Sequence, residues 1–277
     1  MRGDRGEPIL RFEDVSVYFD EQPALDSVSF ALWPGSSCVI LGAAGSGKTV
    51  LLKTAIGLIK PDRGRVWLFG RDITAITESE LVDLRSRVGI LFQEGGLFDS
   101  LTIEENVAYP LLNQRAPRCP RDEVRARVEA ALARVELEHT LEKYPSELSG
   151  GMRRRVGIAR ANVTEPPLVL YDSPTAGLDP ITAHTIMTLI LKERDINKTT
   201  TVIVTHRYQD GYLLANFRYN PASNRIEPVG ADGRQPTSDT KFLVMREGRL
   251  VFEGSQAELE ASPDAYVKKF VKPLRNW

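Results

Sequence analysis

The chain has 277 residues, 42% hydrophobic and 26% charged, which is ordinary for a soluble globular protein of one large or two small domains. Its net charge of −1 excludes a global basic field for nucleic acid, and we interpret the basic run at 153–155 as a solvated helix face. No apolar run approaches the ~18 residues of a membrane-spanning helix, and residues 1–8 lack the apolar segment of a signal peptide. Cys38 and Cys119 show no metal-ligand spacing, as expected of a reducing, cytoplasmic setting.

The first part of the chain predicts strands that lead into a phosphate-binding loop. Residues 9–19 and 25–32 alternate apolar and polar side chains, which is typical of half-buried antiparallel strands. Residues 38–41 (CVIL) predict a short buried strand, and residues 48–58 predict a helix. Between them, residues 42–49 (GAAGSGKT) match the P-loop pattern G-x-x-x-x-G-K-[ST].

This strand–loop–helix context is the one that a P-loop needs. Glycines let backbone N–H groups close around an anion, and the helix N-terminus adds unpaired donors and partial positive charge. The lysine would reach the β- and γ-phosphates, while the threonine hydroxyl would bind Mg²⁺. A chance match in a chain of this length has odds of roughly 1%, so the loop predicts nucleotide binding. The residues expected to bind the nucleotide here are Gly42, Gly45, Ser46, Gly47, Lys48 and Thr49.

The middle of the chain alternates short strands with helices and then becomes mostly helical. We expect a strand at 65–69, a helix at about 78–87 and a buried strand at 88–92 that ends at Gln93. The region from about 94 to 152 is interpreted as an inserted helical subdomain. Its signals are a capping box of Thr102 with Glu105 and an apolar stripe along a helix at 121–138.

The last part of the chain returns to alternating helices and strands. The expected helices are 152–162 and 180–195, and the expected strands are 168–172 (LVLYD) and 200–205, the latter ending at His206. A polar insertion at 216–239 follows, interpreted as a surface segment or loose hairpin. A hairpin of 241–245 with 249–253 and a helical tail at about 256–271 close the chain.

Taken together, these motifs resemble the ATPase subunit of ABC transporters over nearly the whole chain. The matching pieces are the P-loop, Gln93 after a strand, LSGGM at 148–152, LVLYD at 168–172, AGLDP at 176–180, and TH at 205–206. The resemblance implies an α/β fold: a P-loop NTPase (RecA-like) core with an antiparallel β subdomain and an inserted helical subdomain. It implies one domain over 1–277, with the core at 1–93 and 153–277, the helical subdomain at about 94–152 and a tail at about 256–277.

The resemblance also assigns roles around the ATP. Asp172 would hold Mg²⁺ through water, and Gln93 would touch Mg²⁺ and the attacking water. His206 would contact the γ-phosphate, and Lys48 and Ser173 complete the catalytic set, while Thr49 is a Mg²⁺ ligand with Gln93 and Asp172. Each role has a structural alternative: a strand-end turn for Asp172, a surface position for Gln93, and a structural histidine.

In this family a second subunit completes each ATP site. Ser149, Gly150 and Gly151 would open a helix and bind the γ-phosphate of the opposite subunit's ATP, although a simple helix cap is the alternative. Asp179 would lie in the loop that contacts the partner. The adenine would stack on Phe19, with Tyr18 as the second choice, unless both rings only pack a strand.

One position departs from the family pattern. The family usually has Glu directly after the Asp of the LVLYD-type strand, as general base or water-positioning group, and Ser173 stands there. A positioned base is typically worth ~10²–10⁴-fold in rate. Three interpretations follow: hydrolysis is slow and ATP mainly closes the dimer, or His206 with Gln93 suffices, or the residue was substituted to trap the ATP state.

Within the family, the segments 95–102 and 106–111 and the Met after Ser-Gly-Gly are similar to the ATPase of Mla/MCE phospholipid transporters. This resemblance implies a peripheral protein on the cytoplasmic face of a bacterial inner membrane. A groove around Leu97, Phe98 and Tyr109 would receive a membrane permease, and a periplasmic MCE protein would be reached through it. The alternatives are a transporter of another substrate, a non-hydrolysing ATP clamp, and a soluble ABC protein of DNA repair or translation.

Overall fold

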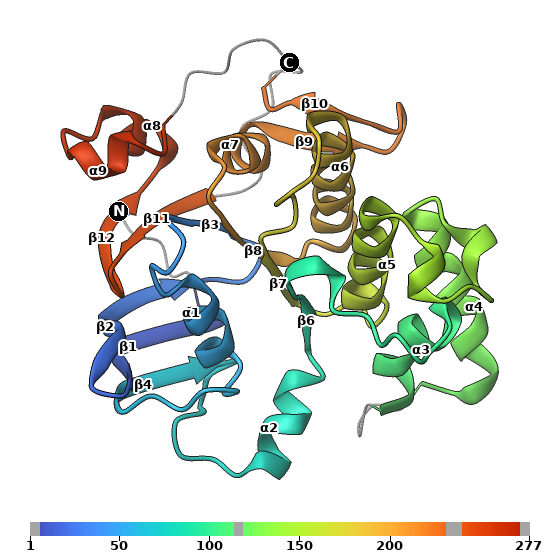
Figure 1. Ribbon diagram of the computed structural model, residues 1–277, viewed down its shortest axis with the longest axis horizontal. Coiled ribbons are helices and arrows are strands. Elements are labelled where there is room, and N and C mark those ends of the chain that lie inside the picture. The colour runs from blue at the N-terminus through green and yellow to red at the C-terminus, as the bar shows by residue number, and fades with distance from the viewer. Residues whose placement is uncertain (1–5, 114–118, 231–239, 272–277) are drawn as a thin grey trace.

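The computed structural model describes residues 6–113, 119–230 and 240–271. They form a central sheet with a smaller antiparallel sheet on one side and helices on the other (Figure 1). This is the predicted α/β fold with a P-loop core, an antiparallel sheet and helices inserted between strands of the core. No helix among the described residues has both the length and the apolar character to cross a bilayer.

The central sheet has six strands in the order β12-β11-β3-β8-β7-β6. All neighbours are parallel except β12, which pairs antiparallel with β11 at the edge. β3, β7 and β8 are buried along their whole length, as expected of strands covered on both faces. The strands are β3 (Ser37–Gly42), β6 (Val88–Leu91), β7 (Leu168–Asp172), β8 (Thr200–Thr205), β11 (Thr240–Arg246) and β12 (Arg249–Gly254).

One face of this sheet packs on α1 (Lys48–Ala55) and on the antiparallel sheet of order β2-β1-β4-β5. Because side chains alternate along a strand, Cys38 and Ile40 of β3 face this side and join Leu51 of α1 in one apolar cluster. The antiparallel strands are β1 (Leu10–Phe19), β2 (Gln22–Leu32), β4 (Arg63–Leu68) and β5 (Arg71–Asp72).

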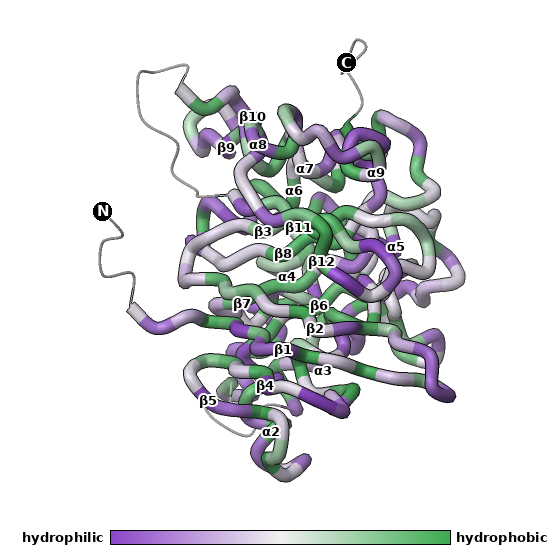
Figure 2. Tube along the Cα trace, turned by 90° about the vertical axis from the view of Figure 1, so that its left-hand side faces the viewer, coloured by the Kyte–Doolittle hydropathy of each residue, from purple (hydrophilic) through white to green (hydrophobic). Residues whose placement is uncertain are grey.

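The other face packs on α5, α6 and α7, and Val39 and Leu41 of β3 point to that side. Figure 2 shows the hydrophobic central strands between more hydrophilic outer segments. The insertion between β6 and β7 carries α3 and α4, which pack with α5. Thr102 and Glu105 form the predicted reciprocal hydrogen bonds ahead of α3. The helices are α2 (Glu78–Arg85), α3 (Ile103–Asn113), α4 (Arg121–Arg134), α5 (Gly150–Asn162), α6 (Pro180–Asn197) and α7 (Tyr208–Asn216), with short 3₁₀ turns η1 (Gln93–Gly95), η2 (Glu138–Thr140) and η3 (Pro145–Glu147).

Several boundaries differ from the predictions. α1 is three residues shorter, because Gly57 turns the chain with a φ of 68°. α5 begins at Gly150, before the predicted start, and α7 was not predicted. The tail is two short helices rather than one, since a proline follows Ser262 and cannot continue a helix. They are α8 (Gln256–Ala261) and α9 (Ala265–Lys268).

The polar insertion predicted at 216–239 begins with a hairpin of β9 (Phe217–Asn220) and β10 (Arg225–Pro228). Its residues 231–239 lie outside the described residues.

Candidate functional site

The topology gathers the predicted site at the carboxyl edge of the central sheet. β3, β8 and β7 are neighbours, and their register pairs Leu41 with Thr205 and Asp172 with Val204. The P-loop that follows β3, His206 after β8, and Asp172 at the end of β7 therefore meet at one edge. Ligands bind at this edge in open α/β sheets, outside the carboxyl ends of the strands.

The P-loop uses its glycines at places where a side chain would not fit. Gly45 and Gly47 have φ values of 75° and 97°, a conformation that favours glycine. An added Cβ at Gly47 would lie 2.4 Å from the carbonyl oxygen of Ala24, and one at Gly42 would lie 2.4 Å from Ser46 Oγ. The loop is therefore a backbone cradle that ends at the N-terminus of α1, which is a favourable place for a phosphate.

Lys48 lies over this cradle. Its Nζ donates to the carbonyl oxygens of Gly42 (2.9 Å) and Ala43 (2.7 Å) and to Ser46 Oγ (3.2 Å). Burial lowers the pKa of Lys48, and the negative charge of Asp172 opposes part of that shift. Because its hydrogen-bond partners are neutral oxygens, the ammonium group can exchange them for a negatively charged phosphate without breaking an ion pair.

Thr49 and Asp172 provide oxygen ligands for a cation. Thr49 Oγ1 donates to Asp172 Oδ2 at 2.9 Å, and the Asp172 side chain is buried, with 4% of its surface exposed. Carboxylate and hydroxyl oxygens are the hard donors that Mg²⁺ prefers, and Mg²⁺ commonly completes its shell with water and substrate phosphate. The two side chains fit a Mg²⁺ site beside the P-loop.

Ser173 is fixed by hydrogen bonds on three sides. Its Oγ donates to Asp172 Oδ1 (3.0 Å), its N–H donates to the carbonyl of Val204 (2.8 Å), and its carbonyl accepts from Arg154 (3.3 Å). Its φ of 52° is in the left-handed region. The hydroxyl thus donates a hydrogen bond to the carboxylate of Asp172. Among the described residues that contact Ser173 here, none is a glutamate that could replace the missing one.

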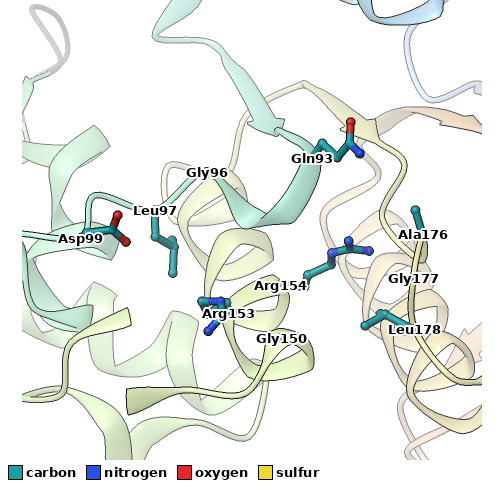
Figure 3. Close-up of a pocket in the computed structure, with 10 residues that line it drawn as sticks. All are labelled: Gln93, Gly96, Leu97, Asp99, Gly150, Arg153, Arg154, Ala176, Gly177 and Leu178. Atoms are coloured by element: carbon teal, nitrogen blue, oxygen red, sulfur yellow. The ribbon is translucent and has the colours of Figure 1, made fainter. Parts of the chain in front are cut away.

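Gln93 begins η1 and lines a cavity of about 620 Å³ between the insertion and the core (Figure 3). Because Leu91 pairs with Tyr171, Gln93 is level with the end of β7 that carries Asp172. Its side chain is exposed, and Figure 3 shows it on the same side of the cavity as the guanidinium of Arg154.

The interpretation of 153–155 as a solvated helix face is wrong for Arg154. Its side chain is 7% exposed, and it donates to the backbone carbonyls of Ser173 and Pro174. Arg153 and Arg155 are half-buried, and each also donates to a backbone carbonyl. Three consecutive residues on a helix point in different directions, so a charge run says little about the exposure of each member.

The SGG segment forms the first turn of α5. Ser149 is the N-cap, and its Oγ accepts from the backbone N–H of Met152 at 3.2 Å. Gly150 and Gly151 are the first helical residues, and an added Cβ at Gly151 would lie 2.8 Å from Thr182 Cγ2. A cavity of about 660 Å³ opens between this turn and the start of α6. Asp179 caps α6 by accepting from two backbone N–H groups and from the Thr182 hydroxyl, which lowers the pKa of its carboxyl.

His206 is exposed at the end of β8, and a buried carboxylate that the sequence did not single out lies nearby. Asp210 Oδ2 accepts from the hydroxyls of Thr175 and Thr205 at 2.6 Å each. Burial raises the pKa of Asp210, and the two hydroxyls lower it in part. Asp210 therefore ties the segment after β7 to the end of β8. The sequence signal was weak, since Asp210 sits four residues after His206 in an unpredicted helix.

Phe19 presents a free ring at the edge of the antiparallel sheet, with 51% of its surface exposed. Tyr18 is half-buried, and its backbone N–H donates to Asp62. Tyr266 of α9 was another contact that the sequence did not indicate. Its hydroxyl accepts from the Ala43 N–H of the P-loop (3.3 Å) and donates to the carbonyl of Met245 (3.1 Å).

The predicted apolar groove is present but is bounded differently. Phe98 and Tyr109 line a groove of about 660 Å³ with ring centroids 4.8 Å apart, and Leu58 also lines it. Leu97 is not part of this groove: it lines the cavity beside Gln93 and packs against the core. The physical reason is that Leu97 packs against the apolar core, whereas the backbone of Phe98 is held by the Asn106 side chain and its ring remains exposed.

A P-loop with a neighbouring carboxylate, at the carboxyl edge of a parallel sheet, defines a P-loop nucleotide-binding protein. The family model for ABC transporters matches residues 25–176, and the chain belongs to this family as an ATP-binding subunit. The ATP-binding subunit energises an ABC transporter, and the family couples ATP hydrolysis to transport.

Among curated proteins, the chain is similar to two methionine import ATP-binding proteins. It is 39% identical over 275 residues to MetN 2 of Rhodococcus jostii, covering 97% of this chain and 73% of the relative. It is 37% identical over 250 residues to MetN of Mesorhizobium japonicum, covering 88% of this chain and 67% of the relative. Across such relatives the chain spans between 53% and 74% of their length. These names give no support to the expected phospholipid transport.

Two solved structures share the fold. The cbiO1 protein of Clostridium perfringens, part of the ABC transporter complex cbiONQ, is 29% identical with a TM-score of 0.74, covering 93% of this chain and 92% of that chain. A dimeric ATP-binding cassette, MJ0796, in a post-hydrolysis state with ADP and Pi is 28% identical with a TM-score of 0.73, covering 89% of this chain and 98% of that chain.

Proposed function

We propose that two copies of this chain close around two ATP molecules and so drive a membrane permease. The observation that carries this proposal is that each chain holds two separate half-sites. The P-loop lies at the edge of the central sheet, whereas Ser149 and Gly150 are exposed at the start of α5. In a closed dimer, the first turn of α5 from one copy would cover the γ-phosphate bound by the other. The dimeric relative with ADP and Pi supports this arrangement.

The roles follow from the contacts. Lys48 and the loop N–H groups bind the phosphates, and Phe19 stacks on the adenine. Thr49, Asp172 and, on the exposed side, Gln93 would hold Mg²⁺, and the bound cation would offset the charge that develops on the phosphates. His206 contacts the γ-phosphate, and Asp179 contacts the partner while it caps α6.

Ser173 makes this a slow ATPase. Its hydroxyl donates a hydrogen bond to Asp172, and a neutral hydroxyl oxygen is too weakly basic to take the proton of an attacking water. Gln93 and His206 can orient that water from the exposed side of the site. The second candidate function is a clamp that binds ATP without hydrolysing it. It follows from the same hydrogen bond if the lack of a base at position 173 abolishes hydrolysis and does not merely slow it.

For the transported substrate, we infer import of an amino acid such as methionine. The support is that relatives at 34% to 41% identity are methionine import ATP-binding proteins. Phospholipid transport, with an MCE protein beyond the permease, rested on short segments at 95–102 and 106–111, and the curated names favour the other substrate. A membrane-bound location follows only through the permease.

The permease contact is assigned to the groove of Leu58, Phe98 and Tyr109. Each of these three residues is between 42% and 49% exposed. Large apolar side chains that are exposed together in one groove are typical of an interaction surface. An apolar helix laid into the groove would cover them.

The test is reconstitution with the permease that co-purifies with this chain. We expect ATP-dependent uptake of labelled methionine into vesicles, and accumulation or extraction of labelled phospholipid instead would restore the lipid hypothesis. Tyr109→Glu should abolish co-purification, whereas Ile196→Glu, at a site 46% exposed on α6, should not. Equal loss in both variants, or retention in both, would contradict the groove assignment.

A further inference from the structure

Arg154 reaches from the first half of α5 to the loop that follows Asp172. Its Nη1 donates to the Pro174 carbonyl at 2.8 Å and to the Ser173 carbonyl at 3.3 Å. A guanidinium keeps its charge and its fixed set of donors, so the two bonds set both the distance and the orientation between helix and loop. Figure 3 shows its guanidinium extending from α5 toward Ala176 and Leu178 across the cavity.

The loop that Arg154 binds has little freedom of its own. The Ser173 N–H and hydroxyl are already engaged by Val204 and Asp172, and its backbone is in the left-handed region. A displacement of Arg154 would therefore act on a loop whose remaining bonds lead directly to Asp172, the carboxylate beside the P-loop.

α5 is held equally firmly to the segment of Gln93. Arg160 donates to the carbonyls of Gly95 (3.1 Å) and Gly96 (2.8 Å). An added Cβ at Gly157 would lie 2.5 Å from Leu91 Cδ1 and 3.1 Å from the carbonyl oxygen of Gly95, so the helix approaches β6 and η1 closely. α5 thus connects three places: its own first turn at Gly150, the loop after Asp172, and η1.

We propose that Arg154 is a positioning residue that couples the two ATP sites of the dimer. This inference rests on the proposed function, because it requires that the first turn of α5 bind the partner's ATP. When that turn engages, Arg154 transmits the new position of α5 to Ser173 and Pro174, and so to the subunit's own ATP site. Binding at one site then improves the other, and the reverse holds by thermodynamic linkage.

The experiment compares Arg154→Met, Arg154→Lys and Arg85→Met in the full chain with Mg²⁺ and ATP. Arg85 is the matched control, because it also donates to two consecutive backbone carbonyls, those of Ile56 (2.8 Å) and Gly57 (2.9 Å), away from the ATP. We measure ATP affinity of the dilute monomer, ATP-driven dimerisation by sedimentation, and the Hill coefficient of hydrolysis.

Arg154→Met should leave monomer affinity for ATP unchanged, because the two hydrogen bonds on which its role depends lead to the carbonyls of Ser173 and Pro174. It should weaken ATP-driven dimerisation about tenfold, as expected for loss of a charge-assisted hydrogen bond, and bring the Hill coefficient to about 1. Arg154→Lys should recover part of the coupling, since an ammonium reaches a carbonyl but not both in the same geometry. Arg85→Met should lower the unfolding temperature and keep wild-type dimerisation and Hill coefficient.

Two results would overturn the coupling role: a wild-type Hill coefficient in Arg154→Met, or a loss of monomer ATP affinity as large as its loss of dimerisation. The proposed function itself fails in a different way, namely if the unmodified chain does not dimerise with ATP at all. If ATP-driven dimerisation and the Hill coefficient fell in all variants, Arg85→Met included, the changes would reflect lost stability alone, and the coupling role would also be rejected.

Discussion

Replacing Ser173 with Glu should accelerate ATP hydrolysis. Ser173 follows Asp172 directly, and its hydroxyl lies 3.0 Å from Asp172 Oδ1. A glutamate at this position would extend past the hydroxyl with a carboxylate able to accept the proton of an attacking water. Neither residue has an advantage in the left-handed backbone at φ 52°, so the change does not add backbone strain.

The magnitude follows from two opposing effects. A positioned general base contributes about 10²- to 10⁴-fold, or about 3 to 5 kcal/mol. The new carboxylate would lie about 5 Å from that of Asp172, and two such charges repel by about 3 kcal/mol at an effective dielectric of 20. This repulsion raises the pKa of the new carboxyl toward neutrality, where a base works best, and bound Mg²⁺ relieves part of its cost to stability. We expect a rate increase of at least about 10²-fold.

Phosphate release at saturating Mg²⁺ and ATP measures the effect. Ser173→Gln has the shape of Glu without the basic oxygen, and Ser173→Ala removes only the hydroxyl, so neither should accelerate turnover. If Ser173→Glu were no faster than the unmodified chain, Ser173 would not limit hydrolysis and the slow-ATPase proposal would be wrong. If Ser173→Gln gained as much, the cause would be packing and not proton transfer.

Phe19→Ala should weaken ATP binding about tenfold without lowering the unfolding temperature, because the exposed ring packs little of the fold; unchanged affinity would exclude stacking. Asp210 has a raised pKa in the folded chain, so its contribution to stability is present at low pH and is lost as pH rises through that pKa. Relative to that of the unmodified chain, the unfolding temperature of Asp210→Asn should therefore rise as the pH increases above about 4, the pKa of an aspartate in an unfolded chain. A difference that stays constant with pH would refute this. Burial raises the pKa of Cys38 to about 12, so a maleimide should label Cys119 alone until the chain unfolds; rapid labelling of both thiols in the folded chain would be contrary to this.

The sequence was sufficient where the structure is determined by a short segment of chain. The P-loop pattern, the buried strand before Asp172 and the SGG turn each depend on neighbours a few residues away. The short apolar run at 38–41 likewise predicted the buried strand β3, and the two faces of that strand pack in two separate apolar clusters. Local pattern and tertiary environment agree in these segments, which is the usual condition for a correct prediction.

The sequence was insufficient where one side chain meets a backbone far along the chain. Arg154 bonds to residues 19 and 20 positions later, and Tyr266 bonds to Ala43 across 223 positions. Such partners are set by the packing of whole elements and leave no local periodicity. The run at 153–155 misled for the same reason, since the charge pattern does not tell which helix face is covered. Leu97 was assigned to the wrong cavity because the sequence does not tell which of two adjacent apolar side chains packs against the core.

Position 173 can either support Asp172 as a Mg²⁺ ligand or supply a base for hydrolysis, and a serine does only the first. With two hydroxyls donating to Asp172, from Thr49 on one oxygen and from Ser173 on the other, the carboxylate is fixed for cation binding. A glutamate at 173 would place a second negative charge beside it and remove one of these donors. Serine in place of glutamate at position 173 therefore removes a base but fixes the carboxylate of Asp172, the Mg²⁺ ligand, more firmly. A chain with this arrangement should bind ATP and close readily but reopen slowly, so that reopening, which depends on hydrolysis, limits the transport cycle.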